Sequence, residues 1–208
     1  IYGDFSGYSD IAIGISRVFG FNLKRNFAFP YFSRDIAEFW RRWHISLSSW
    51  FRDYLYIPLG GSKSGKWISI RNTFIIFVVS GFWHGANWTF IVWGALNAIY
   101  FLPLLILRKN RRHLDTVSPG KRYPSFKETF EIVITFFLVM IGWIFFRADS
   151  ISHALKYLNT IFSKSFFVMP HRMDFVGASM HPLVISMLII LFIIIEWLGR
   201  DKLHVMEN

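Results

Sequence analysis

The longest apolar stretch of this sequence, residues 73–107, is interrupted by the polar and glycine-containing run from Ser80 to Trp88. A straight helix of about 35 residues is roughly 50 Å long, whereas the hydrocarbon core of a bilayer is about 30 Å thick. Because one straight span does not fit, we expect a break or a re-entrant pair of helices at Gly81 or Gly85.

His84 lies inside this interruption, in the middle of an otherwise apolar stretch. Irregular backbone at membrane depth is tolerated where protein or a water-filled cavity surrounds it, and an ionisable residue at that depth suggests a functional site. The alternative is that His84 makes a structural hydrogen bond between helices. The pattern alone favours neither role.

The composition is typical of a polytopic membrane protein. Of the 208 residues, 53% are hydrophobic, and Phe alone contributes 24. Further apolar runs at 129–146 and 182–199 are each about long enough to span a bilayer. We therefore predict an all-α, polytopic transmembrane fold. The sequence contains no cysteine, which excludes disulfides and cysteine nucleophiles.

The net charge of +10 could indicate a nucleic-acid partner. The basic residues, however, cluster beside the apolar runs, as they do in cytoplasmic loops of membrane proteins, so we expect no nucleic acid. The basic loop 108–128 is predicted to be cytoplasmic. The less basic segment 147–181 is predicted to lie outside.

Residues 34–56 have the pattern of one amphipathic helix. Its apolar face holds Ile36, Phe39, Trp40, Trp43, Leu47, Trp50, Phe51 and Tyr54. Its polar face holds Glu38, Arg41, Arg42, Ser49 and Arg52. Because it carries too many charges to span, we expect it to lie along the membrane interface, with its arginines toward headgroups or water. His44 falls at the edge of the aromatic face, where a structural role is the default interpretation.

Residues 1–19 form a further predicted helix with a polar stripe. Ser6, Asp10, Gly14 and Arg17 recur on one of its faces. This stripe either packs against other helices or lines a polar passage. In the second case Asp10 is a candidate substrate-binding residue.

Four stretches together resemble motifs of the membrane-bound O-acyltransferase family. They are residues 2–10, 39–48, 50–61 and 80–87. The turn from Ile57 to Gly61 favours the alginate O-acetyltransferase branch over the D-alanyl transferases of teichoic acid. The resemblance implies one membrane domain over residues 1–208, the C-terminal part of a protein with further spans before it. It also implies the bacterial cytoplasmic membrane as the location.

The resemblance implies that His84 is the catalytic histidine and that His44 is a second histidine near the substrate passage. It implies acyl transfer from a cytoplasmic thioester donor, such as acetyl-CoA, to a hydroxyl group of an exported polysaccharide. The donor is then a co-substrate, and no bound cofactor is expected. The implied partners are membrane lipid, the polysaccharide acceptor and a periplasmic acyltransferase.

This chemistry is consistent with the residues themselves. Transfer to a hydroxyl group needs a base, and a neutral histidine is suited to accept the proton. The developing oxyanion needs hydrogen-bond donors, for which Asn87, Trp83 and Trp88 are candidates. No metal is expected, because His44 and His84 have no neighbouring carboxylate in sequence and no histidine pair is spaced at i, i+4.

Alternative functions remain open at this stage. The chain could be a transport module that passes acyl groups to a separate periplasmic transferase, or it could transfer D-alanine to teichoic acid. A plain channel or scaffold is disfavoured by the paired histidines. The first alternative differs from the enzyme over whether His84 does chemistry or lines a passage.

Overall fold

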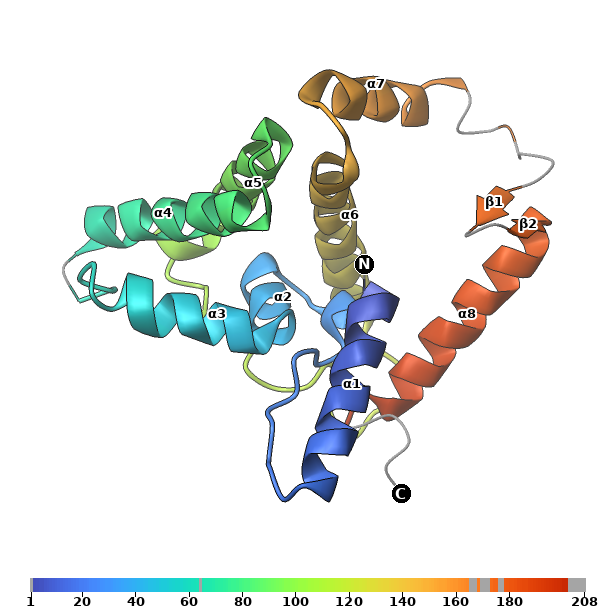
Figure 1. Ribbon diagram of the computed structural model, residues 1–208, viewed down its shortest axis with the longest axis horizontal. Helices are drawn as coiled ribbons and strands as arrows, with labels where there is room; N and C mark the ends of the chain where they lie inside the picture. Colours follow the sequence, from blue (N-terminus) through green and yellow to red (C-terminus); the bar gives the residue numbers. More distant parts are fainter. Residues whose placement is uncertain (1, 64, 165–167, 169–172, 176–177, 202–208) are drawn as a thin grey trace. The chain divides into compact units, whose positions relative to one another are not determined.

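The helices of this chain form two units, Ile1–Arg147 and Ala148–Asn208, in a computed structural model (Figure 1). The structure describes residues 2–63, 65–164, 168, 173–175 and 178–201. Among them, three helices are long and apolar enough to cross a membrane. The prediction of an all-α, polytopic membrane fold is confirmed.

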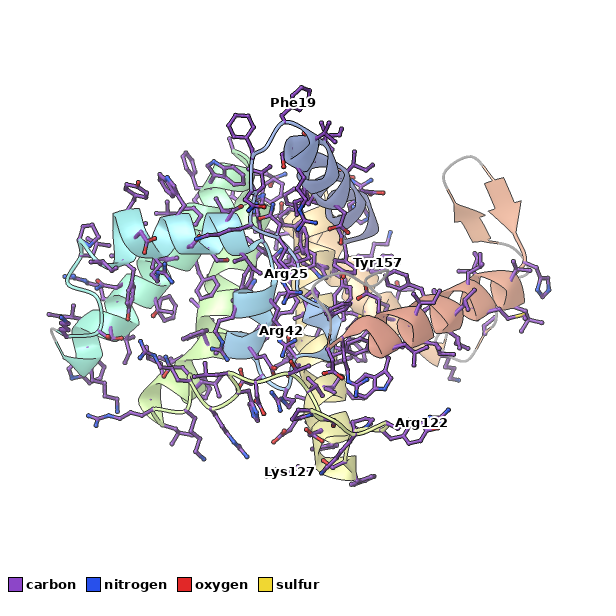
Figure 2. The ribbon with its side chains drawn as sticks, turned by 90° about the horizontal axis from the view of Figure 1, so that it is seen from below. Phe19, Arg25, Arg42, Arg122, Lys127 and Tyr157 are labelled. Atoms are coloured by element: carbon purple, nitrogen blue, oxygen red, sulfur yellow. The ribbon has the colours of Figure 1, made fainter. Side chains whose placement is uncertain are left out.

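The first unit contains six α-helices and two short turns of other helix types. They are α1 (Tyr2–Val18), η1 (Pro30–Phe32), α2 (Ile36–Arg42), α3 (Ile45–Phe51), the π-helix η2 (Arg52–Tyr56), α4 (Lys66–His84), α5 (Trp88–Ile106) and α6 (Phe126–Arg147). Helices α5 and α6 are two of the three possible spans. Arg122 and Lys127 point away from the helices at the start of α6 (Figure 2).

The predicted break in the apolar stretch is confirmed as a hairpin of α4 and α5. Helix α4 ends at His84 with Gly85 as its C-cap, and the Asn87 side chain caps α5 by accepting a 3.1 Å hydrogen bond from the Thr89 N–H. Gly81, the other expected break point, lies within α4. A Cβ atom there would collide with the Phe90 carbonyl oxygen, so this glycine permits close packing of the two helices.

The prediction of one continuous helix over 34–56 is wrong, because α2 and α3 are separate helices. The chain turns at His44, whose φ of 43° lies in the left-handed region. Asn26 stabilises this turn: its carbonyl oxygen accepts from the Ile45 N–H at 2.9 Å, and its side-chain oxygen accepts from the Ser46 N–H at 3.2 Å. Periodicity within the segment did not reveal this tertiary contact.

The assignment of Glu38 to an exposed polar face is also wrong. Its side chain is 1% exposed and lies between Arg34 and Arg42, at 3.0 and 2.7 Å. Arg34 additionally pairs with Asp115, and its other terminal nitrogen lies 3.7 Å from Glu128. Burial of these charges is tolerated because the ion pairs and hydrogen bonds compensate for lost solvation.

The core of the first unit is mostly aromatic. Three of its residues, Ile36, Phe39 and Trp43, belong to the apolar face that the sequence predicted for 34–56. Its buried centre consists of Tyr2, Ile36, Phe39, Trp43 and Val139. These residues come from α1, α2, the α2–α3 junction and α6. The packing therefore brings the α2–α3 junction, which carries His44, near α6.

The second unit contains α7 (Ile151–Ile161), the strands β1 (Met173–Phe175) and β2 (Ala178–Met180), and α8 (Pro182–Gly199), the third possible span. The two strands pair antiparallel, with Met173 opposite Met180. No pattern in the sequence indicated this hairpin. Parts of the segment 147–181 lie outside the described residues. That residues 1–208 form a single domain stays a prediction.

Candidate functional site

His44 and His84 line the same cavity of about 440 Å³ in the first unit. Phe5 of α1, Trp93 of α5 and Phe146 of α6 contribute to its walls. The walls are mostly aromatic, so a polar reaction there would proceed in a medium of low dielectric constant. The two histidines that the sequence singled out are thus brought together by the fold.

His84 is placed by the end of α4. It follows Ser80 by one helical turn, and both side chains line the cavity. Its ring meets Trp93 edge-on at 5.3 Å and Phe146 edge-on at 4.9 Å, measured between ring centroids. These contacts from α5 and α6 fix the imidazole against the cavity wall.

His44 is held at the left-handed turn between α2 and α3. A non-glycine residue in this region is strained by about 1–3 kcal/mol, and such strain often occurs at functional sites. Its ring lies edge-on to Phe5, 4.7 Å between centroids. Burial lowers the pKa of His44 to about 4, and the nearby His84 adds to this effect. His44 is therefore neutral at pH 7.

Neither imidazole makes a hydrogen bond or ion pair with any residue that the structure describes. A histidine that bridges helices structurally would donate or accept such a bond. The structural interpretation of His84, left open by the sequence, therefore has no support within the described part of the chain.

Two tryptophans that line this cavity carry buried hydrogen-bond donors, which the sequence analysis did not predict. The indole N–H groups of Trp40 and Trp143 are buried and have no partner among the described residues. An unpaired buried donor costs about 1–3 kcal/mol, so its retention calls for an explanation. Trp40 was placed on an aromatic face and Trp143 at the end of a span, and neither pattern indicates where an N–H group points.

The other sequence candidates have different positions. Trp83 lines the cavity and contacts His84 at 4.9 Å between ring centroids. Asn87 caps α5, and Trp88 is 74% exposed. Asp10 is exposed on α1. These last three do not belong to the residues that line the cavity, and their predicted role in substrate binding stays a prediction.

Comparison with known proteins identifies the family. A sequence profile of the membrane-bound O-acyltransferase family matches residues 1–146, which is nearly the whole first unit and includes both cavity histidines. The chain belongs to this family. The resemblance seen in the four sequence motifs is confirmed, and the O-acyltransferase match ends where α6 ends.

Several known bacterial proteins resemble most of the chain. A probable alginate O-acetylase of Pseudomonas aeruginosa is 40% identical over 92% of this chain and 35% of its own length. A peptidoglycan O-acetyltransferase of Helicobacter pylori is 43% identical over 76% of the chain and 28% of its own length. A teichoic acid D-alanyltransferase of Bacillus subtilis is 32% identical over 74% of the chain and 40% of its own length. The chain thus spans about a third of the length of these relatives.

Proposed function

We propose that the protein containing this chain is an O-acyltransferase in which His84 acts as general base. The observation that carries the proposal is the cavity in which His44 and His84 meet, free of structural hydrogen bonds within the described residues and walled by aromatic rings. Membership of the O-acyltransferase family supports it.

The reaction needs one proton acceptor and one stabilised intermediate. The His84 imidazole takes the proton of the acceptor hydroxyl while the hydroxyl oxygen attacks the acyl carbonyl carbon. The C–S bond of the thioester then breaks, and the proton passes from His84 to the departing sulfur. General base catalysis of this kind contributes on the order of 10²–10⁴-fold in rate.

The indole N–H groups of Trp40 and Trp143 suit the role of oxyanion donors. They are buried, have no partner in the described structure and belong to the same cavity as His84. Donors that are fixed before the reaction act most strongly where water is excluded. This assignment replaces Asn87 and Trp88 with residues that line the cavity.

The acyl group in this proposal is acetyl, and the acceptor is an exported bacterial polysaccharide such as alginate. Relatives named as O-acetylases or O-acetyltransferases are 40% and 43% identical to the chain, against 32% for the D-alanyltransferase. The donor is a cytoplasmic thioester such as acetyl-CoA. The location is the bacterial inner membrane, and a periplasmic acyltransferase is the expected partner.

The test is the acetyl ester content of the exported polymer in cells that produce equal amounts of each variant in the membrane. His84→Gln keeps hydrogen bonding but removes the base, so acetylation should fall by at least 100-fold, in line with the lower bound of about 10² for base catalysis. His153→Gln, on an exposed site of α7, is the matched control and should have no effect.

Near-normal acetylation in the His84→Gln cells would exclude the general-base role. It would favour the alternative in which this chain passes acyl groups to a separate transferase and His84 lines the passage.

A further inference from the structure

The turn that carries His44 begins a helix without the usual side-chain cap. His44 occupies the N-cap position of α3, and its side chain makes no capping hydrogen bond within the described part of the chain. An N-cap residue normally accepts a hydrogen bond from a first-turn N–H group, which is why Ser, Thr, Asp and Asn are preferred there. The His44 imidazole lines the cavity that it shares with His84.

Asn26 supplies the missing cap from the connector between α1 and α2. Its backbone carbonyl oxygen accepts from the Ile45 N–H at 2.9 Å, and its side-chain oxygen accepts from the Ser46 N–H at 3.2 Å. Its side-chain amide donates a longer hydrogen bond, of 3.4 Å, to the Ser9 hydroxyl of α1. Because Asn26 caps α3 from outside, the side chain of His44 is available to the cavity.

The same connector holds the other side of the turn. The Ala28 N–H donates to the Arg42 carbonyl oxygen at 3.0 Å, and the Arg42 guanidinium donates to the Ala28 carbonyl oxygen at 3.2 Å. Residues 26–28 therefore bond to the chain both before and after His44. A non-glycine residue in the left-handed region persists where the surrounding structure restrains it, and the connector provides this restraint.

The orientation of the His44 ring also depends on the connector. The ring lies edge-on to Phe5, and it is nearly parallel to the ring of Phe27 at 6.5 Å between centroids. Phe5 and Phe27 meet each other edge-on at 5.1 Å. Residues 26–28 thus restrain the backbone of His44 and contact its imidazole.

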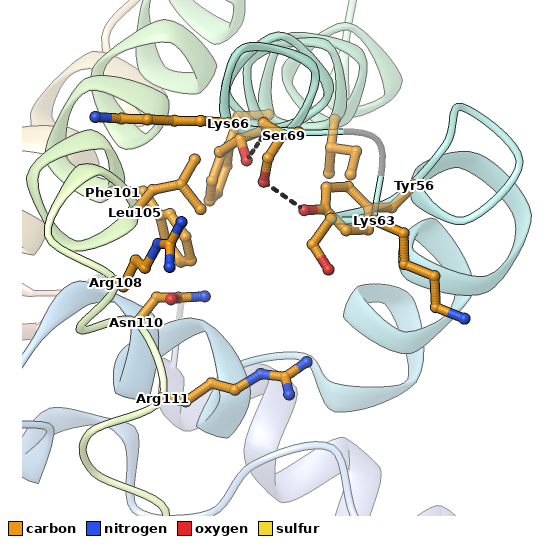
Figure 3. Close-up of a pocket in the computed structure, with 14 residues that line it drawn as sticks. Tyr56, Lys63, Lys66, Ser69, Phe101, Leu105, Arg108, Asn110 and Arg111 are labelled. Carbon is orange, nitrogen blue, oxygen red and sulfur yellow. Dashed lines mark hydrogen bonds between the residues drawn. The ribbon is translucent and has the colours of Figure 1, made fainter.

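The far end of α3 is fastened separately. Helix α3 continues directly into the π-helix η2. Tyr56 of η2 and Ser69 of α4 share a 2.9 Å hydrogen bond at a second cavity, of about 650 Å³ (Figure 3). This bond ties the end of η2 to α4, the helix that carries His84 at its other end. The bonds of Asn26 hold the opposite end, where His44 lies.

We propose that Asn26 is a positioning residue for acyl transfer. It caps α3 in place of His44 and thereby holds the His44 imidazole in the cavity beside His84. Asn26 does not belong to the described residues that line the cavity, so its effect on the reaction passes through His44. The role in acyl transfer rests on the proposed function, whereas the restraint on His44 rests on the contacts of Asn26 alone.

Asn26→Ala in the full-length protein removes the side-chain cap and keeps the backbone bond to Ile45. The acetyl ester content of the exported polymer should fall by about tenfold, at equal amounts of protein in the membrane. A shift of about 1 Å at a reacting centre can cost about 100-fold, and the remaining backbone bond limits the shift. Asn22→Ala, at an exposed position of the same connector, is the matched control and should have no effect.

Asn26→Asp tests for rescue by a conservative variant. A carboxylate oxygen can accept from the Ser46 N–H as the amide oxygen does, and it can also accept from the Ser9 hydroxyl. This variant should therefore retain most of the acetylation that Asn26→Ala loses. Acetylation as low as that of Asn26→Ala would overturn the proposal, because the capping bond would then not be the function of the side chain.

The position of His44 can be measured without turnover, by modification of the purified full-length protein with diethyl pyrocarbonate. This reagent acylates accessible, neutral imidazoles, and mass spectrometry of peptides assigns each modified residue. His44 should react about fivefold faster in Asn26→Ala, which is the usual shift when a helix cap is lost. His153, whose side chain is 53% exposed, is the internal reference and should react at an unchanged rate.

A selective change at His44 separates positioning from a general loss of stability. A lower melting temperature in Asn26→Ala, with the reactivity of His44 unchanged relative to His153, would overturn the proposal. Faster modification of His44 with acetylation equal to that of Asn22→Ala would overturn it as well. Near-normal acetylation in His84→Gln would refute the proposed function, and the reactivity of His44 would still report whether Asn26 restrains it.

Discussion

The guanidinium of Arg34 lies 2.9 Å from the carboxylate of Asp115, which follows it by 81 residues. The same guanidinium makes two hydrogen bonds to Glu38, at 3.1 and 3.0 Å. These contacts fasten the basic loop between α5 and α6 to the start of α2. The basic loop is thereby held next to the helix that leads to His44.

Glu38→Gln should destabilise the protein by about 3 kcal/mol, because it leaves two arginines without their buried counter-charge. Thermal unfolding in detergent measures this as a lower melting temperature. Asp53→Asn provides the control, since the Arg52–Asp53 pair is exposed and should contribute little. Equal melting temperatures for the two variants would contradict a stabilising role for the buried network.

Trp143→Phe and Trp40→Phe should each lower acyl transfer by about 100-fold, the usual effect of removing one oxyanion donor. The smaller phenylalanine ring leaves space in the aromatic wall, which costs some stability, and removal of an N–H group that has no partner in the described part of the chain offsets part of this loss. Acetyl ester content and melting temperature are measured together. Trp67→Phe, at an 80% exposed position, controls for loss of an indole. Full activity in both cavity variants would rule out the indoles as donors.

Gly94→Ala should destabilise the hairpin of α4 and α5 by about 1–3 kcal/mol, the usual cost of overpacking. A Cβ atom at Gly94 would collide with the Phe77 carbonyl oxygen, and backbone cannot move aside as a flexible side chain can. Gly14→Ala is the control, since a Cβ atom in that helix meets nothing within 4 Å. The control should be neutral or stabilising. The melting temperatures of the two variants should therefore move apart.

Single cysteines at Leu114 and Ser163 should differ in labelling by an impermeant thiol reagent in intact cells. The basic loop around Leu114 is predicted to be cytoplasmic and therefore protected, whereas Ser163 is predicted to be outside and labelled. Both positions are exposed. Ser118, in the same loop, is unsuitable because it is 2% exposed and donates to Glu128. Labelling of Leu114→Cys from outside would reverse the proposed orientation.

Much of the fold was predictable because the local periodicity of apolar residues indicates where helices form. The expected helices at 1–19, 129–146 and 182–199 correspond to α1, α6 and α8, and the interruption of the apolar stretch became the turn between α4 and α5. The helix over 34–56 failed as a prediction because Asn26, from outside the segment, caps a second helix at His44. A distant residue leaves no trace in the periodicity of the segment that it contacts.

The sequence by itself determined the membrane class, the family and His84 as the residue to examine, because an ionisable side chain amid apolar residues stands out locally. The tertiary structure decided that His44 faces the same cavity as His84 and that the indole N–H groups of Trp40 and Trp143 are buried without a partner among the described residues. Each of these facts depends on how separate helices pack. Periodicity gives the face of a helix on which a residue lies, but the neighbours of that face are set by side-chain packing between segments far apart in the chain.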